Sequence, residues 1–232
     1  MCAMIHGDLF QSARETETNR PFALQNSKML KATLADQPIL ARTGSMVAYQ
    51  GQVGFENVGS GGIGRMFKAA ATGEGVPLMR CTGRGELFLA DQASEVQVLY
   101  LEDDMISVNG ASVLAFSEGI AWDIHRIAAK GAVMTGGLFN VSLRGTGFVA
   151  VTTKGQPVAL DVTSAPTFAD PQAVVLWTAG VTMDVRVDTG GVKSLLRGGS
   201  GETFQLAFGG QGLVVVQPSE NVPQGAGSQG GA

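Results

Sequence analysis

Short stretches in which apolar and polar residues alternate make up most of this chain, and glycine-rich segments separate them. The alternation begins at Met29–Leu34 and ends at Leu213–Gln217. A period of two residues is typical of β-strands that bury one face. The pattern therefore predicts a single β domain over residues 29–217. Residues 1–28 are polar and mixed and are expected to form a loosely ordered lead-in, while the Gly/Gln-rich residues 218–232 cannot bury a core and are expected to be disordered.

Three glycine pairs interrupt the alternation at nearly even spacing. Each pair follows one alternating stretch and precedes another, which is the pattern of a β-hairpin whose turn needs glycine. Even spacing of like segments indicates one supersecondary unit that is used three times. The residues expected to form these structural turns, with positive φ or no room for a side chain, are Gly83, Gly85, Gly145, Gly147, Gly210 and Gly212.

One stretch departs from the two-residue period. Residues Ile63–Ala71 are rich in alanine and end before Gly73, which predicts a short helix closed by a glycine. The rest of the domain has the strand pattern. The fold class predicted is therefore all-β: a double-stranded β-helix or β-sandwich-like body built from three glycine-hairpin repeats, with one short helix. The repeats would also permit two packed β lobes.

Composition limits the function classes. The 232 residues are 44% hydrophobic and 16% charged, with 33 glycines and a net charge of −4. This negative charge argues against general nucleic-acid binding, which needs a basic field. No apolar run is long enough to cross a bilayer, and no secretory leader is recognisable at Met1–Asp8. The two cysteines, Cys2 and Cys81, favour a reducing compartment, so a cytoplasmic location is expected.

Candidate catalytic and metal-binding groups are few. A cupin-type metal site needs several histidines, but the domain contains only His125, since His6 lies in the lead-in. The acidic run Glu102–Asp104 is interpreted as a solvated hairpin turn, because a calcium loop needs ligands at alternating positions. Strands rather than helices follow the glycine pairs, which argues against phosphate binding. We therefore expect no metal, no cofactor and no enzymatic activity.

Several short segments match a known family in their order and spacing. They are Met29–Leu34, Gly44–Gly51, Thr72–Gly75 and Gly136–Phe139, together with the three glycine pairs. On these segments the chain resembles the bacterial relatives of the altered-inheritance-of-mitochondria proteins, the mitochondrial biogenesis family. The resemblance implies a double-stranded β-helix fold in the superfamily of the tryptophan RNA-binding attenuation protein, which is a ring-forming RNA binder. It implies oligomers, and it carries over no established activity or site residue.

The leading hypothesis is a non-enzymatic β scaffold or interaction protein whose cellular role is undefined. The low content of charge leaves edge strands free to pair, so a homo-oligomer is expected, with a trimer ahead of a dimer. Protein partners are expected without being identified. A small-ligand or lipid-binding module is the alternative, and RNA binding by analogy with the superfamily has less support. Arg80, Arg84 and Arg144 beside the glycine pairs are interpreted as surface charge, with a binding role left open.

Overall fold

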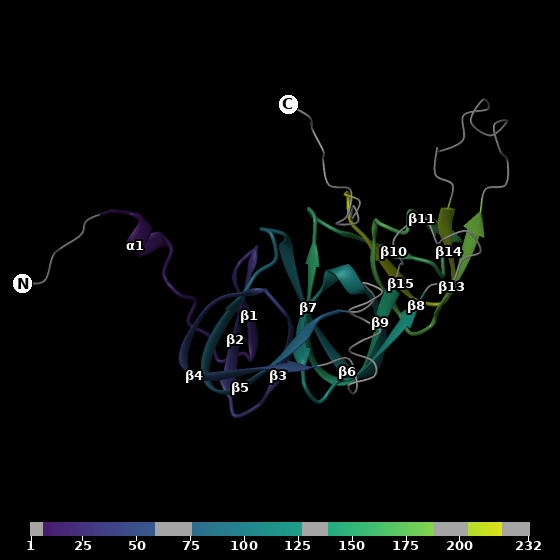
Figure 1. Cartoon of the computed structure of the whole chain (residues 1–232). Coiled ribbons are helices and arrows are strands. Elements are labelled where there is room, and N and C mark those ends of the chain that lie inside the picture. The colour runs from purple at the N-terminus through teal and green to yellow at the C-terminus, as the bar shows by residue number, and fades with distance from the viewer. Residues whose placement is uncertain (1–6, 59–75, 127–138, 188–203, 220–232) are drawn as a thin grey trace, which may run out of the picture.

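Antiparallel β-sheet makes up nearly all the regular structure of this protein. The computed structural model describes residues 7–58, 76–126, 139–187 and 204–219. In this part of the chain, strands β1 to β15 form a twelve-stranded and a three-stranded sheet. The all-β fold class is therefore confirmed. Figure 1 shows the strands following one another across the molecule, from the N-terminal strands at the left to the C-terminal strands at the right.

The strands form three units with the same pairing plan. In each unit the last strand is central, and strands from earlier in the unit pair with its two edges. In the first unit β5 (Leu78–Leu89) is central. One of its edges pairs with β4 (Met46–Val58), and the other pairs with β2 (Met29–Ala35) and β3 (Ile39–Arg42).

The second unit keeps this plan but divides its strands at a different place. The central strand β9 (Phe139–Thr153) pairs on one edge with the long strand β6 (Glu95–Asn109). Its other edge pairs with β8 (Ala121–Arg126) and then with β7 (Val113–Ser117). A 3-10 turn, Gly110–Ser112, leads from β6 into β7.

In the third unit the central strand is itself divided into β14 and β15. β14 lies between β11 and β13, and β15 lies between β10 and β12. The six strands of this unit are β10 (Val158–Asp161), β11 (Thr167–Ala169), β12 (Val174–Thr178), β13 (Val181–Val187), β14 (Phe204–Gly210) and β15 (Leu213–Val216).

Two further ladders join the units side by side. β3 pairs with β7, and β6 pairs with β12, both in the antiparallel sense. The joining strands are buried: Phe116 on β7 is fully buried, and Trp177 on β12 is 7% exposed. Their rings contact Trp122 and Phe208, with ring centroids 6.5 Å and 5.5 Å apart respectively. The largest apolar cluster draws side chains from all three units, so the units share one core.

The glycine pairs do not form hairpin turns, so this prediction is wrong. Gly83 and Gly85 lie inside β5, Gly145 and Gly147 lie inside β9, and Gly210 and Gly212 stand where β14 passes into β15. All six have a positive φ, from 91° to 154°. They bend the central strand where its edge partner changes, for example from β3 to β2 along β5. A strand bent at a glycine and a hairpin have the same order of alternating stretch, glycine and alternating stretch, which is why the sequence pattern misleads.

The sheet also begins earlier than the alternation indicates. β1 (Phe22–Asn26) lies inside the predicted lead-in and pairs with β2. Phe22 is buried, and its ring stacks on that of Phe148 at a centroid distance of 5.8 Å. The single α-helix of the described ranges is α1 (Leu9–Ser12). The helix predicted at Ile63–Ala71 and the tail at 220–232 lie outside the described residues.

Candidate functional site

Strand β4 presents an uncovered edge rich in apolar side chains. β5 pairs with one edge of β4 along its whole length. No strand pairs with the other edge within the part of the chain that the structure describes. Met46, Val47, Tyr49 and Phe55 are between 37% and 55% exposed. Such an edge offers unpaired backbone groups and apolar surface to another chain.

The two aromatic rings of this edge form one small surface. Tyr49 and Phe55 stand on either side of Gly51, whose φ of 91° bends the strand. Their rings meet edge to face, with centroids 5.3 Å apart. Aromatic rings are side chains on which protein–protein contacts concentrate, because they supply large contact area at little cost in side-chain entropy.

The strands that occupy the place of the first half of β4 in the other two units are covered, whereas β8 and β13, in the place of its second half, pair on one edge only among the described residues. β7 pairs with both β3 and β9, and β12 pairs with both β6 and β15. Both strands are buried along nearly their whole length, whereas the residues of β4 are almost all exposed. Of β4, β7 and β12, only β4 therefore lacks a second neighbour among the described residues.

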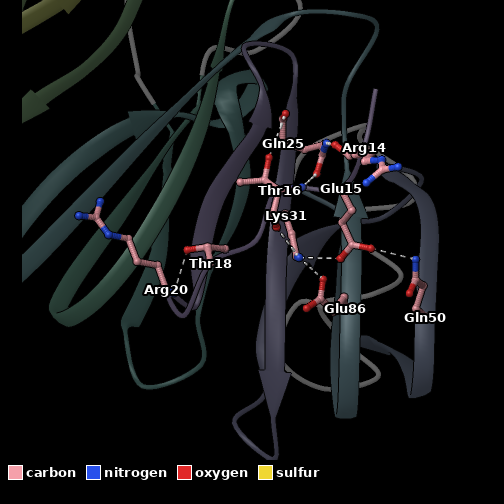
Figure 2. A network of polar contacts seen from close by, with 9 residues as sticks. All are labelled: Arg14, Glu15, Thr16, Thr18, Arg20, Gln25, Lys31, Gln50 and Glu86. Atoms are coloured by element: carbon pink, nitrogen blue, oxygen red, sulfur yellow. Dashed lines mark hydrogen bonds and ion pairs between the residues drawn. The ribbon is translucent and has the colours of Figure 1, made fainter. Parts of the chain in front are cut away.

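Behind this edge a buried lysine joins four segments through polar contacts (Figure 2). Lys31 on β2 is 3% exposed. Its Nζ donates to the Oε1 of Glu15 at 2.6 Å and to the carbonyl oxygen of Thr16 at 2.8 Å, and it forms an ion pair with Glu86 on β5. Glu15 in turn accepts a hydrogen bond from the Nε2 of Gln50 on β4, at 3.2 Å. The cluster thus fixes the lead-in onto β2, β4 and β5.

The charges of this cluster hold one another in place. Burial raises the pKa of Glu86, and the neighbouring Glu15 raises it further. The hydrogen bonds that Glu15 makes with Glu86 and Lys31 lower the pKa of Glu15. Burial acts to lower the pKa of Lys31, but hydrogen bonds to the two glutamates outweigh it and raise that pKa. Lys31 is therefore a charged anchor at neutral pH and is unsuited to act as a nucleophile.

Two of the three arginines near the glycine pairs are paired with carboxylates. Arg80 forms an ion pair with Glu118, and Arg84 lies 2.5 Å from Asp36. An Nη2 of Arg144 lies 3.4 Å from the sulfur of Met105. These carboxylates balance the charges of Arg80 and Arg84.

The remaining candidate groups lie apart from one another. Cys81 is fully buried on β5, and burial raises the pKa of its thiol to about 11. His125 has an exposed side chain 3.8 Å from Asp123. The acidic run at Glu102–Asp104 is a bulge in β6 opposite Thr146 rather than a hairpin turn, because Asp103 has a φ of 50° and its N–H donates to that threonine at 2.9 Å. No three His, Cys, Asp or Glu side chains of the described residues gather as a metal site would require.

Sequence reasoning missed both the exposed edge and the lysine cluster. The start of β4, MVAYQ, has the same run of four apolar residues and one polar residue as its buried counterparts VLAFS and VVLWT, so the pattern alone gives no sign that it lacks a neighbour. The cluster had one sign: Lys31 stands among Met29, Leu30 and Ala32, where a strand buried on both faces would carry apolar residues. Its partners Glu15 and Glu86 are too distant in sequence for any pattern to connect them.

Comparison with known proteins gives a family and a fold. The profile of the family described as mitochondrial biogenesis AIM24 matches residues 22–219. The crystal structure of protein SPYM3_0169 from Streptococcus pyogenes is similar, with a TM-score of 0.69 and 19% sequence identity over 86% of this chain and 92% of that chain. No curated protein matches the chain. None of the helices in the described ranges is long and apolar enough to span a membrane.

Proposed function

The chain belongs to the mitochondrial biogenesis AIM24 family, and from that premise we propose that it is a non-enzymatic β scaffold whose binding surface is the free edge of β4. The observation that carries this proposal is the contrast between β4 and its counterparts. β7 and β12 are paired on both edges and buried, while the start of β4 has the same place in its unit and is exposed.

The chemistry of this edge suits a binding partner in extended conformation. Addition of a strand satisfies the backbone groups of an edge, and side-chain contacts then supply selectivity. Met46, Val47 and Tyr49 supply apolar contact area beside the free backbone groups. Large exposed apolar side chains gathered on one strand are typical of an interaction site rather than of ordinary surface.

The reactive groups of the described residues support a role without catalysis. Catalysis by a lysine or cysteine nucleophile needs a lowered pKa and access to substrate. Cys81 has neither, since it is buried and its thiol pKa is raised to about 11. Lys31 is buried between two glutamates that raise its pKa.

Site-specific photocrosslinking in cells of the protein's own host tests this proposal. A benzoylphenylalanine in place of Tyr49 should give adducts of discrete mass with other protein chains. The matched control is Leu213, which is 43% exposed but lies on β15, a strand paired on both edges. Equal yields at both positions, or none at Tyr49, would overturn the proposal. Adducts with lipid alone would support the lipid-binding alternative instead.

A further inference from the structure

We propose that the partner of β4 is a second copy of this chain, which contributes its strand β11. This inference rests on the proposed function of β4 as a binding edge, and it specifies the occupant. The contact would repeat, between two chains, the joint that links each unit to the next inside one chain. The register of the two internal joints supports this contact.

The two internal joints have the same register. In the first, Ile39 of β3 faces Ser117 of β7, and Leu40 faces Phe116. In the second, Ile106 of β6 faces Thr178 of β12, and Ser107 faces Trp177.

Position along the central strand shows that these pairs are equivalent. Ile39 pairs with Cys81, two residues before Gly83, and Ile106 pairs with Leu143, two residues before Gly145. Both joints therefore begin at the same place in the earlier unit, on the strand that pairs with the central strand just before its glycine pair.

Strands in these two places also stand at the two ends of the molecule, where no neighbouring unit pairs with them among the described residues. In the third unit Thr167 of β11 pairs with Phe208, two residues before Gly210, so β11 occupies the place of β3. Among the described residues β11 is an edge strand. In the first unit the start of β4 occupies the place of β7 and β12. All three strands pair with the far end of their central strand, and all three have a break in register at the same point: Met46/Ala48, Val113/Ala115 and Val174/Leu176.

Continuing the register gives a specific contact between copies. Thr167 of one copy would face Gln50 of the next, Phe168 would face Tyr49, and Ala169 would face Ala48. Like the two internal joints, this ladder has three pairs of residues. An aromatic residue stands at the position of Tyr49 in every unit, as Phe116 and Trp177 show.

The exposure of these side chains fits a missing neighbour. Phe116 is 0% exposed and Trp177 is 7% exposed, because a neighbouring unit covers them, whereas Tyr49 is 48% exposed. Phe168 on β11 is also 48% exposed, even with the guanidinium of Arg186 at 5.0 Å from its ring centroid. Both ends of the proposed contact are therefore uncovered aromatic surfaces.

The shape of the molecule directs this contact to a second copy. Figure 1 shows β4 and β11 at opposite ends of the protein, so one chain cannot join its own ends. A contact between different surfaces is heterologous, and it builds either a closed ring or an open filament. The proposal therefore specifies a head-to-tail assembly rather than a two-fold symmetric dimer.

Disulfide trapping between two variants tests the register. In a Cys2→Ser background, a Tyr49→Cys chain mixed with a Phe168→Cys chain should give a dimer on oxidation, because directly opposed residues of paired strands bring their Cβ atoms within about 5.5 Å. Tyr49→Cys mixed with Thr167→Cys is the control, since a shift of one residue places the side chain on the other face of the strand. Equal trapping in the two mixtures, or trapping in neither, would overturn the proposed contact.

Sedimentation of the full chain gives an independent test that needs no change in β4. The wild-type protein should sediment as an assembly at micromolar concentration, and Phe168→Lys should sediment as a monomer of 24.0 kDa. Tyr100→Lys is the control, because Tyr100 is 55% exposed on β6 of the second unit, which contains neither strand of the proposed contact. A monomeric wild-type chain, or an assembly that Phe168→Lys leaves unchanged, would refute self-association. Tyr49 adducts with other proteins would in that case still support the scaffold function.

Discussion

At Gly83 the bent central strand β5 approaches β4 so closely that a methyl group would lie 2.1 Å from the carbonyl oxygen of Gln52. At Gly145, the same position in the second unit, the nearest heavy atom would lie 3.7 Å away. The two glycines have similar φ values of 102° and 128°. Comparing Gly83 with Gly145 therefore separates the effect of backbone conformation on stability from the effect of close approach between strands.

Alanine substitutions should show this separation. We expect Gly145→Ala to lower the free energy of unfolding by about 1–3 kcal/mol, the usual cost of a side chain in the left-handed region. Gly83→Ala should lower it by more, because the backbone of β4 must also move. Urea denaturation of both variants measures the difference. If the two variants are equally destabilised, φ alone explains the glycines and the close approach has no energetic role.

The raised pKa of Glu86 makes the stability of the folded protein depend on pH. Since this pKa is raised in the folded protein, the folded state holds the proton more tightly than the unfolded state does. The stabilisation is complete below the ordinary value of 4.5 and is lost as the pH rises through the folded value. The stability of the wild type relative to Glu86→Gln should therefore decrease between pH 4.5 and neutral pH.

Glu118 supplies a control of opposite sign. Its hydrogen bond with Arg80 lowers its pKa, so its contribution is present above 4.5 and is lost as the pH falls through the folded value. The stability of the wild type relative to Glu118→Gln should therefore increase as the pH rises to about 4.5 and stay nearly constant above it. Thermal unfolding at pH values on both sides of 4.5 measures both differences, and a Glu118 contribution that falls as the pH rises to 4.5, or a Glu86 contribution that rises above it, would contradict the two pKa directions.

Among the elements, the lead-in depends on one lysine for its attachment beside β4. Lys31→Met removes the ammonium group that holds Glu15 at 2.6 Å and the carbonyl of Thr16 at 2.8 Å. We expect a loss of about 2 kcal/mol, the scale of hydrogen bonds to charged groups, and faster tryptic cleavage after Arg14. Lys28→Met is the control, because the Lys28 side chain is 52% exposed and its contact with Glu95 spans 3.7 Å. Equal cleavage in the two variants would show that Lys31 does not hold the lead-in.

Strand positions could be read from the sequence better than strand connections. Alternation identified most strands because half-buried strands carry apolar side chains at every second residue. It divided β5 and β9 in two, because a glycine inside a strand interrupts the pattern as a turn does. It also missed β1, whose burial depends on Phe148, a residue on another strand. The missing information in each case concerns neighbours that are distant in sequence.

At the scale of the whole molecule, the proposed assembly predicts a stability that depends on concentration. A partner that binds only the folded chain stabilises it by mass action. The Tm of the wild type should therefore rise with protein concentration, while that of Phe168→Lys should stay constant. Differential scanning calorimetry over a wide concentration range measures this. Parallel behaviour of the two proteins would mean that the β11 edge takes no part in association.

The family and the fold class could be predicted from the sequence because both depend on the order of short segments along the chain. The pairing of β3 with β7 and of β6 with β12 could not, because each ladder joins residues from different units. The candidate site had the same limitation. Tyr49 and Trp177 occupy equivalent positions, and only the presence of a neighbouring strand makes one exposed and the other buried.

The order of strands within each unit has a consequence for biosynthesis. The central strand pairs with every other strand of its unit except β1, yet it is the last to be translated. In the first unit β4 is complete at Val58, whereas β5 ends at Leu89. At ~5–20 residues per second this interval lasts on the order of seconds. During translation there are therefore three stages, one for each unit, in which apolar strands have been synthesised but the central strand that pairs with them has not. Those stages are the points at which a ribosome-associated chaperone would be needed to cover them.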